Sequence, residues 1–297
     1  MVEVLFIGLS LSSILLLIAL GLAITYGAMG VINMAHGDMV MIGAYVTVMS
    51  KIWLGLNFYF AIPLAFIVTA LIGLFIERIV IRRLYGRLLD TLLATWGISI
   101  LLQQAIRLEL GLSFFGIRIE GLGPGLQKVD VPDFLRGTIG FGDTDLNSYR
   151  LFIIVVTIAL TVLTWFLLYR TSFGVQVRAI IRNPEMAAAS GIDVKRVNSL
   201  TFAFGSGLAG VAGVMMSGFK TVFPDMGATL VVDGFMVVVA GGVGSIYGTI
   251  LSSGLLGEIN ALVALASNDI IARAVVFAVV ILVIILKPKG LFSFKER

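Results

Sequence analysis

Apolar residues fill this chain in runs of roughly 17 to 22, the length a helix needs to cross about 30 Å of hydrocarbon. Eight such runs cover residues 5–24, 29–49, 58–76, 91–108, 151–169, 199–219, 246–266 and 271–286. A ninth stretch, 230–242, is shorter and runs into GGVGS, so a full span, a half-helix and a re-entrant segment all remain open. The pattern predicts an all-α polytopic membrane protein with about eight to nine transmembrane segments, including broken or re-entrant helices.

Lys and Arg gather in three short segments, which marks the cytoplasmic side because cytoplasmic loops are enriched in these residues. Thirteen of the 21 basic residues lie there: Arg78, Arg82, Arg83, Arg87, Arg170, Arg178, Arg182, Lys195, Arg196, Lys287, Lys289, Lys295 and Arg297. Residues 109–149 hold six acidic and three basic residues and the turn signals GLGPG and FGDTD, so we expect an extracytoplasmic loop. The basic segments can share the cytoplasmic side only if the number of crossings is odd. The ninth stretch must therefore also cross, with the N-terminus outside and the C-terminus in the cytoplasm.

The composition agrees with a membrane protein built as one transmembrane domain over residues 1–297. Hydrophobic residues make up 59% of the chain and charged residues 13%, where about 45–50% and 25% are usual; the mean hydropathy is +1.08. The first run lacks a basic n-region and a small-residue cleavage site, so it predicts a retained span. With no cysteine and one histidine, disulfides and any metal site needing two imidazoles are excluded, and we expect no metal and no cofactor.

The cytoplasmic segment 173–200, FGVQVRAIIRNPEMAAASGIDVKRVNSL, contains a short predicted helix. Asn183 can cap its start, Pro184 suits the first helical position, and Glu185 favours the positive end of the helix dipole. Gly191 follows as the residue that ends it. From these residues alone, the helix is either a docking element held along the membrane or a connector made helical by propensity.

Three motifs resemble a known family. The spacing of Glu185, Ala187 and Gly191 resembles the EAA-x3-G coupling motif of bacterial ATP-binding-cassette importer permeases, with Met186 replacing its first alanine. NMAHGDMVMIGAY (33–45) and VVVAGGVGSIYGT (237–249) resemble the branched-chain amino acid permease family of the LivH/LivM type, over nearly the whole chain. LLDTLLATWGISILLQQ (88–104) and FPDMGATLVVDGFMVVVAGGVGS (223–245) look closest to UrtB-type urea permease subunits.

The resemblance implies the partners and location of the chain. It implies two cytoplasmic ATPase subunits, an extracytoplasmic substrate-binding protein and a second, related permease subunit, in a bacterial-type plasma (inner) membrane, while the sequence itself leaves a homodimer open. ATP hydrolysis is expected in the partner subunits, since no G-x-x-x-x-G-K-[ST] occurs here. The loop 173–198 would contact the ATPase through Arg178, Arg182, Asn183, Pro184, Glu185, Ala187 and Gly191.

A neutral polar stripe crosses the run 91–108. Thr95, Ser99 and Gln103 recur at i, i+4 and i+8, with Trp96 beside them. Urea offers four N–H donors and one carbonyl without a formal charge, so a neutral stripe suits a urea pathway. The alternative is that these side chains bond neighbouring helices, as polar residues commonly do in membrane bundles.

Asp233 lies inside the apolar sequence VVDGFMVVVA. A carboxylate facing lipid costs roughly 2.5–3.5 kcal/mol on insertion scales, so we expect it to face the interior or a wet cavity. There it can accept N–H groups from urea or an amino acid's ammonium, or it can pair with an interior cation such as Arg273.

Asn33 and His36 belong to a polar group, with Asp38, in a region that holds Gly27, Gly30 and Gly37. We expect a broken helix there, because freed backbone groups need side-chain partners, and His36 near the pathway. A helix break is expected at Gly37. A second is expected in GGVGS at Gly241, Gly242 and Gly244, where the alternative is a close helix crossing.

The sequence is compatible with four functional hypotheses for this chain, which differ in how well they fit. The favoured one is the permease subunit of an ATP-binding-cassette importer for urea or a short-chain amide, and the alternative is the same machine for branched-chain amino acids. A proton-coupled secondary transporter using Asp38, Asp233 and Glu258 is more remote. A membrane enzyme is disfavoured, because a single histidine supports no nucleophile–base constellation, and basic residues beside apolar runs do not indicate nucleic-acid binding.

Overall fold

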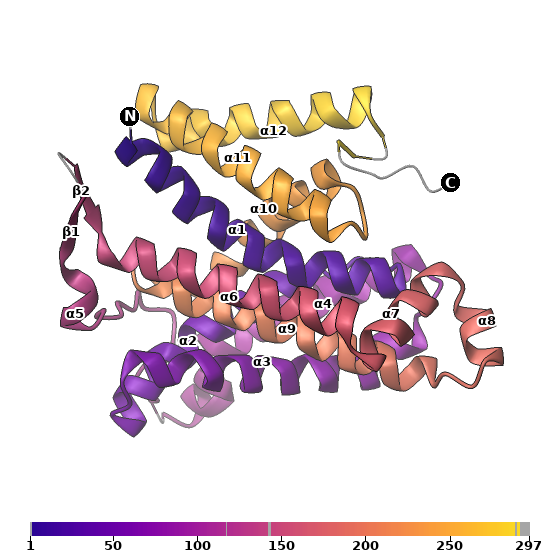
Figure 1. Ribbon diagram of the computed structural model, residues 1–297. Helices are drawn as coiled ribbons and strands as arrows, with labels where there is room; N and C mark the ends of the chain where they lie inside the picture. The colour runs from indigo at the N-terminus through magenta and orange to yellow at the C-terminus, as the bar shows by residue number, and fades with distance from the viewer. Residues whose placement is uncertain (1, 117, 142–143, 289, 292–297) are drawn as a thin grey trace.

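The computed structural model describes residues 2–116, 118–141, 144–288 and 290–291, and over these the chain is almost entirely helical (Figure 1). In chain order the elements are α1 (Val2–Met29), α2 (His36–Leu54), α3 (Phe58–Ile79), η1 (Ile81–Arg83), α4 (Leu88–Arg107), η2 (Glu109–Phe115), α5 (Asp133–Arg136), β1 (Thr138–Phe141), β2 (Thr144–Asn147), α6 (Ser148–Arg170), α7 (Ser172–Arg182), α8 (Pro184–Ala189), α9 (Val194–Ser217), α10 (Met226–Gly241), α11 (Ile246–Ala266) and α12 (Asp269–Leu286). The predicted all-α fold is confirmed.

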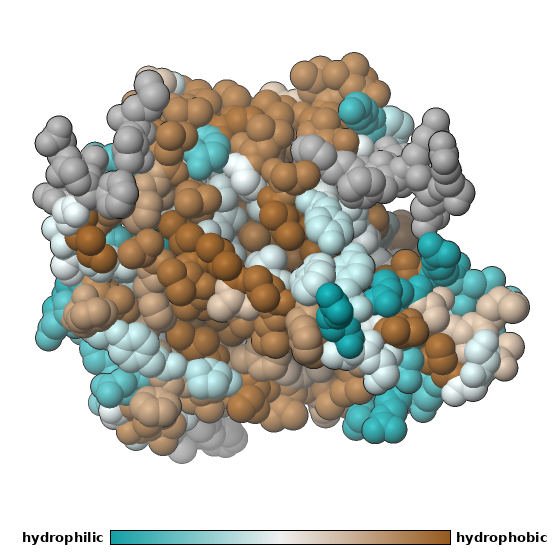
Figure 2. Space-filling view, viewed as in Figure 1, coloured by the Kyte–Doolittle hydropathy of each residue, from teal (hydrophilic) through white to brown (hydrophobic). Residues whose placement is uncertain are grey.

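A helix occupies each of the nine apolar stretches. Among the described residues, seven helices are long and apolar enough to span a membrane, namely α1, α3, α4, α6, α9, α11 and α12. The other two are α2 with 19 residues and α10 with 16, roughly 28 and 24 Å long at 1.5 Å per residue. Apolar residues dominate the middle of the face in Figure 2, while hydrophilic residues gather toward its ends.

The span expected over residues 29–49 is wrong at its start. α1 continues to Met29, and α2 begins only at His36. Gly30, with φ +62°, has the left-handed backbone that glycine adopts without steric cost. The His36 side chain contacts the carbonyl of Ile18, about three turns before the end of α1, so residues 30–35 run back along that helix. Hydropathy missed this break because apolar residues lie on both sides of it.

Helix α9 is the centre of the bundle. It packs against α1, α2 and α3, and 89% of its most apolar 18-residue stretch is buried, against 17% for α4. A Cβ on Gly213 would lie 1.9 Å from the Val40 carbonyl oxygen, and one on Gly43 would lie 2.0 Å from the Gly210 carbonyl oxygen. Glycine at these crossings lets the backbones of α2 and α9 touch, as small residues do in membrane helix interfaces.

The connections lie at two ends of the bundle (Figure 1). One end carries the start of α1, α5 and the β1–β2 hairpin, in which Thr138 pairs with Asn147. Helices α7 and α8 project from the other end, where α12 also finishes. The segment predicted to be extracytoplasmic and the basic segments predicted to be cytoplasmic therefore lie at opposite ends of the bundle. Four charged residues used in that prediction lie outside the described residues: Asp143, Lys289, Lys295 and Arg297.

The segment 109–149 is fastened to the end of α2. Lys51 Nζ lies 2.7 Å from Asp130 Oδ2, and Trp53 Nε1 donates to the Glu120 carbonyl at 3.1 Å. The hydrogen bond and charge of the Lys51 ammonium lower the pKa of Asp130 below its usual value. This segment therefore covers one end of the bundle as a folded cap.

The orientation leads to a labelling prediction. The chain has no cysteine, so a thiol introduced by Asp133→Cys, whose side chain is 95% exposed, should react with a membrane-impermeant maleimide in intact cells. A thiol introduced by Ala188→Cys on exposed α8 should react only after the membrane is opened. The opposite labelling pattern would reverse the orientation inferred from Lys and Arg.

Candidate functional site

The loop after α6 forms the short helix that its sequence predicts. The Asn183 side chain accepts a hydrogen bond from the Met186 amide at 3.0 Å, and Pro184 is the first residue of α8. Gly191 follows with φ +85°. Glu185 is exposed and makes no hydrogen bond or ion pair with the described residues. The helix thus presents an unused carboxylate at its positive end.

Arg178 and Arg182 lie on α7, beside this helix, and differ in their surroundings. Both line a cavity of about 220 Å³ with Tyr169 and Ile246. The Arg178 guanidinium carbon lies 5.2 Å from the Tyr169 ring centre, a cation–π contact that holds it against α6. Arg182 is exposed. Ala187 is buried and attaches α8 to the bundle.

The break between α1 and α2 is held by side chains, as the polar residues there predict. Asn33 Oδ1 accepts from the Ala35 amide at 3.1 Å, and Thr95 Oγ1 accepts from the Met34 amide at 3.1 Å. His36 is fully buried and its Nε2 lies 3.1 Å from the Ile18 carbonyl oxygen, so that nitrogen carries the proton. These side chains satisfy a freed backbone in the interior.

The α4 stripe packs against this break. Gln103 Nε2 donates to Asp38 Oδ1 at 3.0 Å and contacts Ser99 Oγ at 3.1 Å. Thr95 and Ser99 are buried on the same face. Trp96 was expected beside them, but its side chain is 55% exposed and does not share their buried face. Successive residues of a helix are 100° apart, which carries Trp96 off the stripe.

The predicted helix breaks fall only partly on the named glycines. Gly242 and Gly244 have φ +103° and +77° between α10 and α11. Gly37 instead lies in the first turn of α2, where a Cβ would be 2.0 Å from the Gly227 carbonyl oxygen, and Gly241 is the last residue of α10, against the Gly248 backbone. These two positions are close helix contacts. The break expected at Gly37 is therefore wrong, whereas Gly241 forms the close helix crossing that was the alternative for GGVGS.

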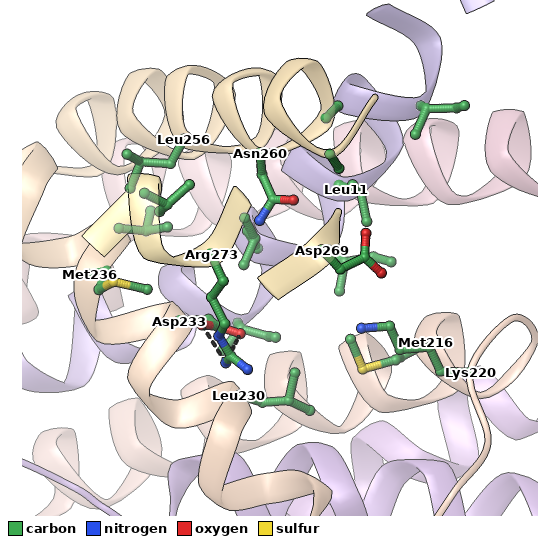
Figure 3. A pocket seen from close by; sticks show the side chains of 18 of the residues that line it. Leu11, Met216, Lys220, Leu230, Asp233, Met236, Leu256, Asn260, Asp269 and Arg273 are labelled. Atoms are coloured by element: carbon green, nitrogen blue, oxygen red, sulfur yellow. Dashed lines mark hydrogen bonds and ion pairs between the residues drawn. The ribbon is translucent and has the colours of Figure 1, made fainter. Parts of the chain in front are cut away.

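Asp233 lines a cavity of about 780 Å³ between α1, α10, α11 and α12. Arg273 Nη2 lies 2.7 and 2.8 Å from its two carboxylate oxygens (Figure 3). Of the alternatives for Asp233, the ion pair with Arg273 is the one formed. No α4 residue is among the described residues that line this cavity, so the structure does not bring Asp233 together with Gln103, Ser99 and Thr95.

The cavity also holds polar residues that the sequence analysis did not select: Arg150, Lys220, Asn260 and Asp269. Arg150, Lys220 and Asp269 lie at the ends of apolar runs, where a charged residue is ordinary, and Asn260 is a neutral residue inside the run 246–266, so no local signal distinguished them. Their shared position depends on how four helices cross. Within the described residues, no group of three metal-ligating side chains occurs.

Comparison with known proteins decides the family. The family described as "Branched-chain amino acid transport system / permease component" matches residues 4–285. This chain belongs to that family. It is 31% identical to the branched-chain amino acid permease BraD of Pseudomonas aeruginosa, over 97% of this chain and 94% of the relative. It is equally identical to LivH of Escherichia coli, over 98% and 95%.

A more distant relative agrees with this assignment. LivM of Salmonella typhimurium is 27% identical over 83% of this chain and 60% of the relative. Among solved structures, PsaBC from Streptococcus pneumoniae in complex with Fab matches with a TM-score of 0.52 and 16% identity, covering 95% of this chain and 91% of that one. That likeness concerns the fold alone. The chain is a multi-pass membrane permease component and not an enzyme.

One charged cluster of this permease was not selected from the sequence. Glu77, at the end of α3, is fully buried and accepts hydrogen bonds from Ser199 Oγ and Tyr85 Oη, each at 2.5 Å. Arg82 Nη2 lies 3.3 Å from Glu77 Oε2. Glu77 therefore joins α3 and η1 to α9, which follows directly on the α8 loop. An acid inside the run 58–76 would have drawn notice, but Glu77 lies one residue beyond it.

We expect Glu77→Leu to lower the amount of folded permease. The leucine removes the carboxylate that accepts from Tyr85, Ser199 and Arg82; Ser199 keeps the Lys195 carbonyl and Arg82 keeps Ser199 Oγ, so the largest loss is at Tyr85. An unsatisfied buried donor costs about 1–3 kcal/mol. The Arg82 share is smaller because 31% of its side chain is exposed. The readout is the monodisperse fraction after mild-detergent extraction, with Glu120→Leu on the exposed cap as control. Equal fractions for both variants would show that the cluster is dispensable.

Proposed function

We propose that this chain is the membrane-spanning permease subunit of an ATP-driven importer for branched-chain amino acids, located in the cytoplasmic membrane. The observation that carries the proposal is the family match over residues 4–285, together with relatives named as high-affinity branched-chain amino acid permeases at 31% identity over nearly the whole chain. ATP hydrolysis is assigned to separate subunits and substrate capture to an extracytoplasmic binding protein.

The comparisons favour amino acids over the urea hypothesis. That hypothesis used Asp233 as an acceptor for N–H groups and the neutral stripe of α4 as a pathway. Asp233 lies in a cavity that no described α4 residue lines, and Thr95, Ser99 and Gln103 are bonded to the α1–α2 break or to Asp38, so the two parts of that pathway are not joined. BraD of Pseudomonas aeruginosa and the LivH proteins of Escherichia coli and Methanocaldococcus jannaschii are each named for branched-chain amino acid transport. Branched-chain amino acids are therefore the proposed substrates.

Helix α8 is the proposed contact with the ATPase. Its N-cap, its proline and the left-handed Gly191 set the start and the end of a short helix, at the end of the molecule from which α7 also projects (Figure 1). Glu185 is free of internal contacts and is available to a partner. A connector formed by propensity alone would not require this charged, exposed first turn.

A second, related permease subunit is proposed to cover α4. Leu89, Leu93, Trp96 and Ile100 are all exposed and recur at i, i+4, i+7 and i+11, so they form one apolar stripe. Only 17% of the apolar stretch of α4 is buried within this chain. This chain matches both LivH and LivM relatives, which supports a pair of related subunits.

Uptake by the reconstituted importer tests this function. Proteoliposomes containing the chain with its permease and ATPase partners, and the binding protein outside, should accumulate labelled leucine only when ATP is enclosed. Unlabelled isoleucine and valine should compete, and a hundredfold excess of urea should not. Accumulation of labelled urea that leucine does not suppress would show that the importer transports urea. Uptake driven by a proton gradient without ATP would identify a secondary transporter.

A further inference from the structure

The cavity between α1, α10, α11 and α12 changes in polarity along its length. On α1 it runs from Val4 to Ile18, roughly 20 Å at 1.5 Å per residue. Lys220 and Asp269 lie where α9 ends and α12 begins, and Arg273 lies one turn further along α12. Beyond the Asp233–Arg273 pair the lining is aliphatic: Ile18, Met236, Val237, Leu256 and Val276. The cavity is thus charged toward one end and apolar at its floor.

The ion pair does not exhaust the bonding capacity of its members. Arg273 contacts Asp233 and the Thr229 carbonyl through Nη2 alone, at 2.7, 2.8 and 3.2 Å. Its Nη1 and Nε donate to none of the described residues, and a guanidinium has five N–H donors. A carboxylate has about four lone-pair positions, so Asp233 also retains acceptor capacity. Figure 3 shows the two side chains meeting in the cavity.

Both charges are accessible from the cavity. The Arg273 side chain is 40% exposed and the Asp233 side chain 21%. The volume of about 780 Å³ lies in the range of small-molecule sites, roughly 300–1,000 Å³. Such sites combine an apolar lining with a few polar groups that fix orientation, and this cavity has both.

We propose that this cavity binds an aliphatic amino acid as a zwitterion. The carboxylate of the amino acid accepts from the free guanidinium nitrogens of Arg273, and its ammonium donates to Asp233. Its side chain points to the aliphatic floor of the cavity. Urea would leave that floor unfilled, and an anionic lipid headgroup would meet the negative charge of Asp233. The inference rests on the proposed function, because it names the site at which that substrate binds.

Protection of an introduced thiol tests the site. Asn260 lines the cavity on α11, and the chain has no other thiol, so Asn260→Cys in the assembled transporter should react with a small charged methanethiosulfonate. Leucine at saturating concentration should slow that reaction at least fivefold, and urea should not. The control is Ser267→Cys, an exposed residue outside the cavity lining, whose reaction leucine should not alter.

A size change provides a second test. Ala264 lines the cavity, and Ala264→Leu should raise the KM for leucine at least tenfold, whereas Ala266→Leu, on the exposed end of the same helix, should leave it unchanged. Four results would each overturn the site. The first two are leucine uptake without protection at Asn260→Cys, and no reaction at Asn260→Cys while Ser267→Cys reacts. The other two are protection that follows lipid composition and an unchanged KM in Ala264→Leu. Failure of the wild-type importer to take up leucine would instead overturn the proposed function.

Discussion

Replacement of Gly213 by valine is expected to remove nearly all folded permease from the membrane. The added Cβ would lie 1.9 Å from the Val40 carbonyl oxygen and 2.8 Å from the Ala44 amide nitrogen. Both are backbone atoms of α2, so no side-chain rotation relieves the overlap and the two helices must separate. Overpacking in a close-packed core typically costs about 1–3 kcal/mol, and displacement of a whole helix places this case at or above the upper limit.

The matched control is Gly254→Val, because no atom lies within 4 Å of a Cβ at that position. Both substitutions put the same β-branched residue inside a long apolar helix, so their effects on helix propensity are alike. The measurement is the amount of monodisperse permease after mild-detergent extraction. We expect a fall of at least about tenfold, equivalent to roughly 1.4 kcal/mol, for Gly213→Val only; equal yields would show that α2 and α9 do not cross at this glycine.

The contrast between these two glycines marks what the sequence can predict. Transmembrane helices were found from apolar length, because each must satisfy its own backbone in lipid and therefore needs a minimum number of apolar residues. Length says nothing about which face of a helix touches another. Gly254 and Gly213 are indistinguishable in hydropathy, and only the crossing with Val40 separates them.

Polar residues were predictable where one strong requirement acted on them. Asp233 had to avoid lipid, and Arg273 was a cation within another apolar run, so their pair was among the alternatives derived from the sequence. Trp96 carried no such requirement. An indole suits an interior hydrogen bond, a lipid face or a subunit contact, and its 55% exposure follows from the turn of α4.

The α8 helix was predictable for a different reason. Capping is local, so Asn183, Pro184 and Gly191 determine the start and the end of the helix within nine residues of sequence. Because the fold does not use the Glu185 side chain, a change at this residue separates docking from folding. That separation is absent at Gly213 and at Glu77, where structure and function would fail together.

Glu185→Lys is therefore expected to abolish most uptake while the amount of permease in the membrane stays normal. The substitution places a positive charge at the positive end of the α8 dipole, which costs about 0.3–1 kcal/mol in the helix, and it removes the carboxylate proposed to meet the ATPase. We expect leucine uptake to fall at least tenfold, less ATPase to copurify, and Glu185→Gln to show a smaller loss. The control is Asp133→Lys, which makes the same charge change on the cap at the opposite end, where the side chain is 95% exposed. It should leave uptake unchanged, because the ion pair of Asp133 with Arg136 is a surface pair of little strength. Normal uptake in Glu185→Lys, with normal ATPase association, would remove this residue from the docking surface and return α8 to the role of a connector.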